Sequence, residues 1–358
     1  MRRAVVQVVQ ELAPPGGIQV MVLELRRLLA ANLDVHVVSI EGTFERLNGA
    51  WARVAALENR LHALDKQPGV DLKALVRLTH LLREVSPVAV HTHHIGPLLY
   101  GGLAARLVGT RRLVHTEHDT WHLAEPRRRR LQRAALAMLR PRLVADAQTV
   151  AVALRRAIPE ARPLVIPNGI DTSLFLPGDR RMARRALRLP DSGRLIGSAG
   201  RLEPVKGHAL LIEALAMLPT DVALALAGNG SQRPVLAALA ARLGVAERVH
   251  FLGHIDSIVT FYRALDVFCL PSVAEGLPLS LLEAQACGVA AVATDVGGVR
   301  DALAPEISVA VPAGDSKQLA TALDTLLQRP TPADPRPFVV EHGDAQRMAS
   351  AYEALLTE

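Results

Sequence analysis

The chain contains little cysteine and few aromatic residues. Of its 358 residues, 2 are cysteines and 3% are aromatic. So few cysteines exclude a disulfide-stabilised secreted scaffold. The two, Cys269 and Cys287, lie in apolar surroundings and lack the spacing of metal ligands. We expect both thiols to be buried and inert in a reducing compartment. The scarcity of aromatic side chains argues against nucleic acid as a partner, because single strands bind by stacking on such side chains.

Long hydrophobic runs are also missing. After Arg2 and Arg3 only about five apolar residues come before Gln10 and Glu11, too few for the core of a signal peptide. The most hydrophobic stretch, residues 210–227, is interrupted by Glu213, Pro219 and Asp221, whereas a membrane-spanning helix needs about 20 apolar residues. We therefore expect a cytoplasmic protein, with a buried helix and a buried strand at 210–227.

Positive charge is concentrated in the first half of the chain. Residues 1–170 contain 24 Lys and Arg against 14 Asp and Glu, and residues 171–358 contain 17 against 21. A helix that begins after Pro126 would carry the densest cluster, several members of which share one face: Arg127, Arg128, Arg129, Arg130, Arg133, Arg140 and Arg142. This face is either merely solvated or binds an anionic membrane surface or lipid-linked substrate. Nucleic acid is the least favoured interpretation.

Short β-branched apolar runs alternate with amphipathic stretches, which is typical of βαβ units in parallel sheets. In the first half we predict strands at 4–9, 34–40, 88–92, 112–116 and 143–147, helices at 19–31, 72–85, 97–108 and 149–157, and a less regular segment at 51–64. In the second half we predict strands at 195–199, 223–227, 249–252, 267–270, 290–294 and 308–311, and helices at 208–217, 234–243, 258–264, 281–287, 316–327 and 344–356.

The predicted fold class is therefore α/β, with two doubly wound Rossmann-like domains. Turn residues at 164–171 place the boundary between domains at 1–168 and 169–336, and residues 337–358 form a C-terminal helix after a proline-rich connection at 330–337. Ligands of such sheets bind outside the carboxyl ends of the strands. We expect the domains to face each other across a cleft, with function in the loops that follow strands.

The loop at 200–207, with the sequence GRLEPVKG, directly follows a predicted strand and leads into a helix. Arg201 and Lys206 lie beside the N-terminus of that helix, where free N–H groups and the helix dipole favour an anion. The two side chains form a candidate diphosphate clamp. The alternative is a pair of surface cations in a loop.

Two carboxylates, Glu275 and Glu283, flank a turn that contains Gly276 and Pro278. Glu283 falls within an apolar helix, where an unpaired carboxylate would cost several kcal/mol, so it needs partners such as sugar or ribose hydroxyls. Free backbone amides near the start of that helix suit a phosphate. A helix cap with a capping carboxylate is the alternative.

Two glycines, Gly16 and Gly17, follow Pro14 and Pro15 at a strand-to-helix turn. They allow the backbone to approach a ligand closely. The segment is not a G-x-G-x-x-G fingerprint, and no acidic residue ends the second predicted strand. A nicotinamide-dependent dehydrogenase is therefore disfavoured.

Histidine-rich runs end two strands of the first domain, with the sequences HTHH at 91–94 and HTEHD at 115–119. Converging imidazoles could bind zinc, but neither run has the i, i+4 spacing of a metallohydrolase. Recognition of hydroxyl or phosphate groups and purely structural histidines are the other two interpretations.

Together these segments resemble the family 4 retaining glycosyltransferases of the GT-B fold over nearly the whole chain. The motifs that carry the resemblance are Gly16-Gly17, HTHH at 91–94, HTEHD at 115–119, VIPNGID at 165–171, GRLEPVKG at 200–207, AGNG at 227–230, FLGHID at 251–256, DVFCLPS at 266–272 and EGLPLSLLEAQACG at 275–288. One departure is Ala290, where the family usually has proline. The terminal helix resembles the family's final helix, which packs back toward the first domain.

The resemblance implies roles for the site residues. Arg201 and Lys206 would bind the donor diphosphate and neutralise charge on the departing nucleotide. Glu283 would hold the ribose, Glu275 the donor sugar hydroxyls, and His118 would lie beside the reacting sugar. The remaining donor contacts would come from Gly17, His254, Ile255, Gly276, Leu279 and Ser280.

The implied reaction transfers a sugar from a UDP- or GDP-linked donor to an acceptor hydroxyl, with retained configuration and without a cofactor or essential metal. The acceptor would be a glycan or lipid-linked sugar of surface polysaccharide, lipopolysaccharide or glycolipid synthesis, bound by His93, His94, Glu117 and Trp121. An arginine face that binds lipid would place the protein peripherally at the inner face of the cytoplasmic membrane. The alternatives are a non-catalytic nucleotide-sugar-binding subunit of a polysaccharide assembly complex and a GT-B epimerase or sugar-phosphate synthase.

Overall fold

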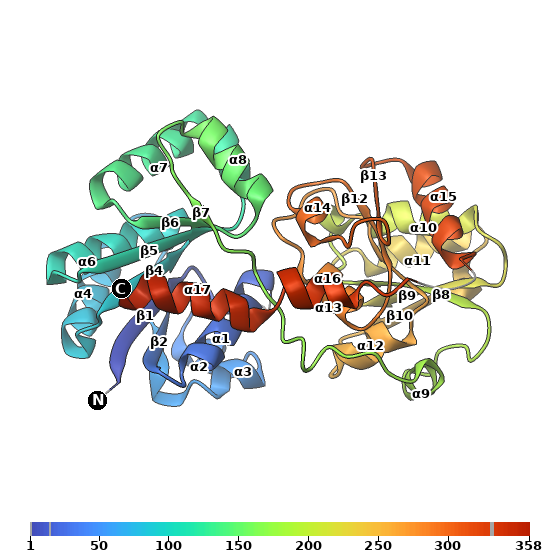
Figure 1. Ribbon diagram of the computed structural model, residues 1–358, viewed down its shortest axis with the longest axis horizontal. Coiled ribbons are helices and arrows are strands. Elements are labelled where there is room, and N and C mark those ends of the chain that lie inside the picture. The colour runs from blue at the N-terminus through green and yellow to red at the C-terminus, as the bar shows by residue number, and fades with distance from the viewer. Residues whose placement is uncertain (1, 14–15, 330–332) are drawn as a thin grey trace. The chain divides into compact units, whose positions relative to one another are not determined.

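The chain forms two compact units in a computed structural model that describes residues 2–13, 16–329 and 333–358 (Figure 1). The first unit comprises Met1–Gly169 and Ala345–Glu358, and the second comprises Ile170–Asp344. Pro14, Pro15 and Pro330, which belong to two of the segments named above, lie outside the described residues. Each unit contains one parallel sheet covered by helices, which confirms the predicted α/β fold class.

The first unit has a seven-stranded parallel sheet in the order β3-β2-β1-β4-β5-β6-β7. Its strands are β1 (Arg3–Val9), β2 (Leu33–Ser39), β3 (Leu61–Ala63), β4 (Ala89–His93), β5 (Arg112–Glu117), β6 (Arg142–Ala145) and β7 (Leu164–Val165). Its helices are α1 (Gly17–Leu29), α2 (Phe44–Asn48), α3 (Ala52–Ala55), α4 (Leu72–Val85), α5 (Ile95–Pro97), α6 (Leu103–Val108), α7 (Pro126–Leu139), α8 (Gln148–Ala157) and α17 (Ala345–Thr357).

Strand β1 shows how alternation builds the two faces of this sheet. Val5 and Val9 belong to a core shared with α1 and α17, whereas Val6 and Val8 belong to a core shared with α4 and α6. Successive side chains of a strand point to opposite faces, so a continuous apolar run covers both. The strand order reverses between β1 and β4, and this switch point is where ligands of open α/β sheets bind.

The second unit has a six-stranded parallel sheet in the order β10-β9-β8-β11-β12-β13. Its strands are β8 (Arg194–Ala199), β9 (Val222–Ala227), β10 (Val249–Gly253), β11 (Val267–Leu270), β12 (Ala291–Thr294) and β13 (Val309–Val311). Its helices are α9 (Arg180–Ala186), α10 (His208–Ala216), α11 (Arg233–Arg242), α12 (Ile258–Ala264), α13 (Leu279–Ala286), α14 (Val299–Ala302), α15 (Ser316–Leu327) and α16 (Arg336–His342).

Several elements differ from the prediction. Strand β3 occupies part of the segment expected to be irregular. Helix α16 begins at the end of the expected proline-rich connection, so two helices, α16 and α17, follow it where one terminal helix was expected. The expected helix at 97–108 is divided into α5, a π-helical turn at Leu98–Gly102 and α6. Glycines at this turn allow close packing, since an added Cβ on Gly101 would lie 2.9 Å from the Cγ2 atom of Thr92.

The arginine-rich segment before β8, for which no helix was predicted, contains α9. Arg184 of this helix is 3% exposed. Its guanidinium lies 2.6 Å from the Oδ2 atom of Asp266 and donates to the carbonyl of Ala264. The segment is therefore helical because a buried, fully paired arginine attaches it to the second unit, and composition alone does not reveal that pairing.

The cysteines and the hydrophobic stretch behave as predicted. Cys269 and Cys287 are both buried free thiols, and burial raises the pKa of Cys287 to about 12 and raises that of Cys269 further. Residues 210–227 contribute to helix α10 and strand β9. Over the described part of the chain, the helices are too short or too polar to cross a membrane.

Candidate functional site

Three polar side chains meet at the carboxyl edge of the second unit's sheet. The Nζ atom of Lys206, on the loop after β8, lies 2.6 Å from the Oε1 atom of Glu275, on the loop after β11. The hydroxyl of Ser272 donates to the same oxygen at 2.6 Å. The Lys206 side chain is 23% exposed and that of Glu275 is 10% exposed. A cation is thus held at the carboxyl ends of two neighbouring strands, where solvent can still reach it.

Close backbone packing brings these two loops together. Gly207 has a φ of +66°, and a Cβ atom there would lie 2.0 Å from the carbonyl oxygen of Pro271. The amide of Val273 also donates to the carbonyl of Val205 at 2.8 Å. A side chain at position 207 would separate the loops, so this glycine determines how near Lys206 lies to Glu275.

Arg201 lies on the same loop but makes no contact with this cluster. It is exposed, and no hydrogen bond or ion pair of its guanidinium is found among the described residues. The loop itself is held by Glu203, whose carboxylate accepts from the amide and the hydroxyl of Ser231. The structure therefore does not bring Arg201 into contact with Lys206, although both lie at the same edge of the sheet.

Helix α13 begins beside the Lys206–Glu275 pair. The amides of Leu279 and Ser280 occupy its first two positions, where a helix has no internal acceptors. Glu283, one turn further, is half-buried and accepts a 2.6 Å hydrogen bond from the hydroxyl of Tyr262. Tyr262 is a site residue that the sequence prediction missed, because α12 carries it and nothing in its local pattern marks it as a partner of Glu283.

The other predicted donor contacts lie around this edge without contacting Lys206. Gly276 accepts through its carbonyl from the amide of Gly298 at 2.8 Å. His254 and Ile255 follow β10, and His254 is exposed. Strand β9 separates β10 from β8, so these two residues share the edge but not the cluster.

In the first unit, a buried carboxylate organises the loops after β4 and β5. Glu117 is fully buried. His94 Nδ1 lies 3.3 Å from its Oε1 atom, His115 Nε2 lies 3.4 Å from Oε2, and Gln132 donates to Oε2. His94 has a φ of 67°, an uncommon value for a residue with a side chain, and such strain persists where the surroundings hold it.

A second chain of contacts surrounds His118. Its Nδ1 atom lies 3.0 Å from the Oδ2 atom of Asp146, which also accepts from the side-chain amide of Asn168 at 2.8 Å. Its Nε2 atom lies 3.1 Å from Nδ1 of His93. All four side chains are buried. Asp146 and the contact with Asn168 were not predicted, since Asp146 directly follows β6 in an otherwise apolar segment.

Burial and charge set the protonation of these groups. Burial raises the pKa of Glu117, but its interactions with His115 and His94 outweigh burial and hold that pKa well below its ordinary value. Burial lowers the pKa of His94, but Glu117 and Asp119 raise it more. Both shifts favour the charged forms of Glu117 and His94, and so favour an ion pair between them.

In the pair formed by His118 and Asp146, burial is the largest effect on both pKa values. Burial lowers the pKa of His118 to about 3 and raises the pKa of Asp146 well above its ordinary value. Both shifts favour neutral groups. We assign a carboxylic acid that donates to His118 Nδ1, so that the N–H of His118 Nε2 donates to His93.

The remaining predicted residues of the first unit differ in accessibility. His93 and Glu117 are fully buried, so in this arrangement they support His118 and His94 instead of offering a surface to an acceptor. Trp121 is 55% exposed and His94 is partly exposed. Gly17 is the exposed first residue of α1, and an added Cβ would meet no atom within 4 Å.

No group of three or more His, Cys, Asp or Glu side chains within residues 2–13, 16–329 and 333–358 is arranged to hold a metal ion. The histidines after β4 and β5 instead pair with each other and with carboxyl groups.

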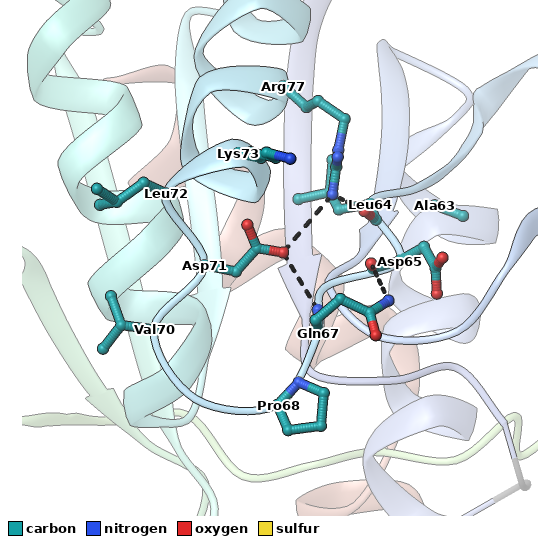
Figure 2. A pocket seen from close by; sticks show the side chains of 10 residues that line it. All are labelled: Ala63, Leu64, Asp65, Gln67, Pro68, Val70, Asp71, Leu72, Lys73 and Arg77. Carbon is teal, nitrogen blue, oxygen red and sulfur yellow. Dashed lines mark hydrogen bonds and ion pairs between the residues drawn. The ribbon is translucent and has the colours of Figure 1, made fainter.

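An open pocket of about 770 Å³ follows β3, at the carboxyl edge of the same sheet (Figure 2). Figure 2 shows the Asp71 carboxylate directed toward Gln67 and Arg77 across it. The amide of Gln67 donates to Asp71 at 3.2 Å, and the guanidinium of Arg77 lies 3.8 Å from it. With Asp65 and Lys73 also in the lining, acidic and basic groups balance. Such a lining can hydrogen-bond hydroxyl groups.

The second unit thus offers a cation and free amides for a phosphate, with carboxylates nearby for hydroxyls. The chain matches two families that cover most of its length. Residues 179–337 match the family described as "Glycosyl transferases group 1", and residues 15–174 match the one described as "Glycosyltransferase Family 4".

Curated relatives carry the name D-inositol 3-phosphate glycosyltransferase. The protein of Salinispora tropica is 33% identical over 357 residues, which cover 87% of this chain and 74% of the relative. That of Mycolicibacterium gilvum is 38% identical over 217 residues, which cover 58% of this chain and 48% of the relative. The chain thus spans about half the length of some of these relatives.

Solved structures show the same fold. Anabaena Alr3699/HepE in complex with UDP has a TM-score of 0.85 at 21% identity and covers 100% of both chains. Sucrose-phosphate synthase from Thermosynechococcus elongatus has a TM-score of 0.83 at 21% identity and covers 99% of this chain and 98% of that one. The chain therefore belongs to the family 4 glycosyltransferases and has their GT-B fold.

Proposed function

We propose that the chain is a retaining, metal-independent glycosyltransferase that moves a sugar from a UDP- or GDP-linked donor to an acceptor hydroxyl. The contact between Lys206 and Glu275, beside the N-terminus of α13, is the observation that carries this proposal. A diphosphate at this edge would meet the Lys206 ammonium and the amides of Leu279 and Ser280. These are preorganised donors aimed at the charge that develops on a departing phosphate.

The carboxylates have a different task from the acid and base pair of a glycosidase. Glu275 would hold a hydroxyl of the donor sugar, and Glu283, held by Tyr262, would bind the ribose. We assign the proton of the acceptor hydroxyl to the leaving phosphate on the same face of the sugar. The protein's contribution is then positioning and charge stabilisation, with Lys206 and Arg201 as its cations.

For the acceptor we propose a glycan or lipid-linked sugar of surface polysaccharide or glycolipid synthesis, used at the inner face of the cytoplasmic membrane. The mixed lining of the pocket after β3 suits a hydroxyl-rich ligand better than a bare anion. The name of the curated relatives makes an inositol phosphate the second acceptor class to test. His94 and Trp121 remain the predicted side chains for direct acceptor contact.

The first test is a thermal-shift titration with UDP, GDP, dTDP and ADP in the presence of EDTA. A nucleotide at 100 times its Kd stabilises the fold by about 2.7 kcal/mol, which raises the melting temperature by several degrees. We expect UDP or GDP to produce this shift in the wild type and a smaller one in Lys206→Ala. No shift with any nucleotide would contradict the donor site.

The second test is turnover with the matching nucleotide sugar and each acceptor class. Proton NMR of the product gives the anomeric configuration, and retention is expected. An inverted product, or activity that EDTA abolishes, would contradict the proposed reaction. Nucleotide binding without transfer to any acceptor would favour a non-catalytic binding subunit.

A further inference from the structure

A second pocket lies at the amino edge of the first unit's sheet. It has a volume of about 580 Å³ and lies between the C-terminal half of α7, the start of β6 and residues 158–164, which lead from α8 into β7 (Figure 1). The strands of this sheet are parallel, so their amino ends lie at the edge opposite His94 and His118. The pocket is therefore separate from the predicted reaction site, and the sugar transfer proposed above does not depend on it.

The lining of this pocket has an excess of positive charge. It contains four arginines and a single carboxylate, Glu160, which is paired with Arg133. Among the residues that the structure describes, Arg162 donates only to the backbone carbonyls of Pro159 and Ala161. In the described part of the chain, Arg140 and Arg142 have no side-chain hydrogen bond or ion pair, and both are exposed. Three guanidinium groups thus lack a carboxylate partner at one opening.

Neighbouring arginines add to this charge. Arg106 donates to the carbonyl of Leu139, the last residue of α7, and to that of Arg140, which follows it, and so lies against the pocket's rim. Arg112 begins β5, and Arg142 of the adjacent strand pairs with Val114. This register places Arg112, two residues before Val114, at the same amino edge of the sheet as Arg142. The positive potential extends beyond the lining itself.

The other part of the lining is apolar. Leu136, Ile158 and Leu164 contribute to it, and Leu164 is 48% exposed. No aromatic side chain is among the lining residues, so the stacking platforms that single-stranded nucleic acids use are missing from this part of the described surface. A bare phosphate would leave the apolar wall in contact with water. A ligand with an anionic head and an apolar chain would satisfy both parts.

We propose that this pocket binds one molecule of an anionic phospholipid. The phosphate would be held by Arg140, Arg142 and Arg162, because each guanidinium group can donate two parallel hydrogen bonds to two oxygens of one phosphate. The first segment of an acyl chain would lie on Leu136, Ile158 and Leu164. The lipid contact of this protein is then the C-terminal end of α7 and not the Arg127–Arg130 end, which lies about 20 Å away along the helix axis.

The experiment uses the full chain and dihexanoyl-phosphatidylglycerol, kept below its micelle concentration and titrated by calorimetry. The test variant is the double substitution Arg140→Gln and Arg142→Gln. The matched control is Arg127→Gln and Arg129→Gln, which removes the same charge from the other end of α7. All four side chains are exposed, so melting temperatures equal to the wild type are expected.

We expect the lipid to bind the wild type and the control equally. The pocket variant should bind about 25-fold more weakly, at about fivefold per arginine. Vesicles with 30% phosphatidylglycerol should bind the wild type and the control equally and the pocket variant more weakly. Vesicles of pure phosphatidylcholine should bind none of the three.

Three outcomes would overturn the proposal. Absence of lipid binding to the wild type would exclude the site. Equal losses in both variants would indicate general electrostatic adsorption. Equal affinity for glycerol phosphate would indicate a site for free phosphate esters in which the apolar wall has no function.

Discussion

The ammonium of Lys206 and the hydroxyl of Ser272 both contact the same oxygen of Glu275, each at 2.6 Å. Lys206 comes from the loop after β8 and Glu275 from the loop after β11, two strands that are neighbours in the sheet. The carboxylate thus holds the cation at the carboxyl ends of these strands. This contact makes Lys206 the most direct residue to test.

Replacing Lys206 by alanine should lower kcat by about 10²–10³-fold, as for the loss of one strong donor to a developing oxyanion. Steady-state kinetics with the identified donor measure this effect. Lys317→Ala, on helix α15 of the same unit, is the control and should have wild-type kinetics. Turnover of Lys206→Ala within threefold of the wild type would remove Lys206 from the mechanism.

Tyr262→Phe tests whether the Tyr262 hydroxyl positions Glu283 for the donor. Its 2.6 Å hydrogen bond to Glu283 would be lost, and a hydrogen bond to a charged group contributes about 1.5–3 kcal/mol. We expect the donor KM to rise about tenfold with little change in kcat. Tyr352→Phe removes a similarly buried hydroxyl, one bonded to Thr116 in the first unit, and should lower stability without affecting the donor KM. Equal KM effects in both variants would argue against a specific role for Tyr262.

Gly17→Ala separates a ligand contact from a structural requirement. An added Cβ would meet no protein atom within 4 Å, and alanine is the better helix former by about 1 kcal/mol. The melting temperature should therefore stay the same or rise, whereas the donor KM should increase about tenfold if the backbone approaches the phosphate there. Ser316→Ala, at the first residue of α15, is the control. An unchanged KM in Gly17→Ala would mean that the donor does not approach this turn.

Two substitutions of Asp146 test its assigned protonation. If the Asp146 carboxylic acid donates a hydrogen bond to His118 Nδ1, asparagine can replace it, because its amide also donates. The kcat of Asp146→Asn should then stay within about threefold of the wild type. Asp146→Ala should lose about 10²-fold through misplacement of the imidazole. The pH profile of kcat distinguishes positioning from simple loss of stability. An Asn variant as impaired as the Ala variant would instead indicate an ionised Asp146 that accepts a hydrogen bond from His118 Nδ1–H.

Acidification should destabilise the first unit. Burial lowers the pKa of His91, His93 and His118, so below about pH 6.5 the unfolded chain binds more protons than the native unit. Each such histidine reduces the stability by about 1.4 kcal/mol per pH unit in this range, down to the native pKa, about 3 for His118. The raised pKa of Asp146 opposes this effect, because a buried carboxyl group that stays protonated in the native state stabilises it as pH falls. It is one group against three histidines, so a net loss of stability is expected. The raised pKa of His94 matters only above pH 6.5, where its stabilisation is lost as pH rises.

Urea unfolding at pH 7.0, 6.0 and 5.5 measures this dependence. The chain's two tryptophans, Trp51 and Trp121, both belong to the first unit, so their fluorescence reports on that unit. We expect the urea midpoint to fall with pH. The exposed His80 provides the control, and His80→Gln should leave the dependence unchanged. A midpoint that is constant or rises toward pH 5.5 would contradict the neutral, buried histidines.

Much of the fold and part of the site could be predicted from the sequence, because their signals are local. Alternating apolar runs and amphipathic stretches predicted most strands and helices of both sheets. In a parallel sheet the carboxyl ends of the strands share one edge, so strand–loop–helix order alone placed Lys206 and Glu275 at that edge. The same reasoning placed His94 and His118 together. Strand β3 was missed because its three residues are too few for a period to appear.

The pairings within the site were decided only by the tertiary structure. Lys206 and Glu275 are 69 positions apart, His118 and Asp146 are 28 apart, and Tyr262 and Glu283 are 21 apart. Each contact depends on strand register and on close backbone approach, such as that of Gly207 to Pro271, and no local pattern encodes either. The protonation states of the site residues were also decided only by the tertiary structure. His94 and His118 belong to similar runs of histidines, but Glu117 raises the pKa of one and burial lowers that of the other, because charge and desolvation depend on every element packed around a group.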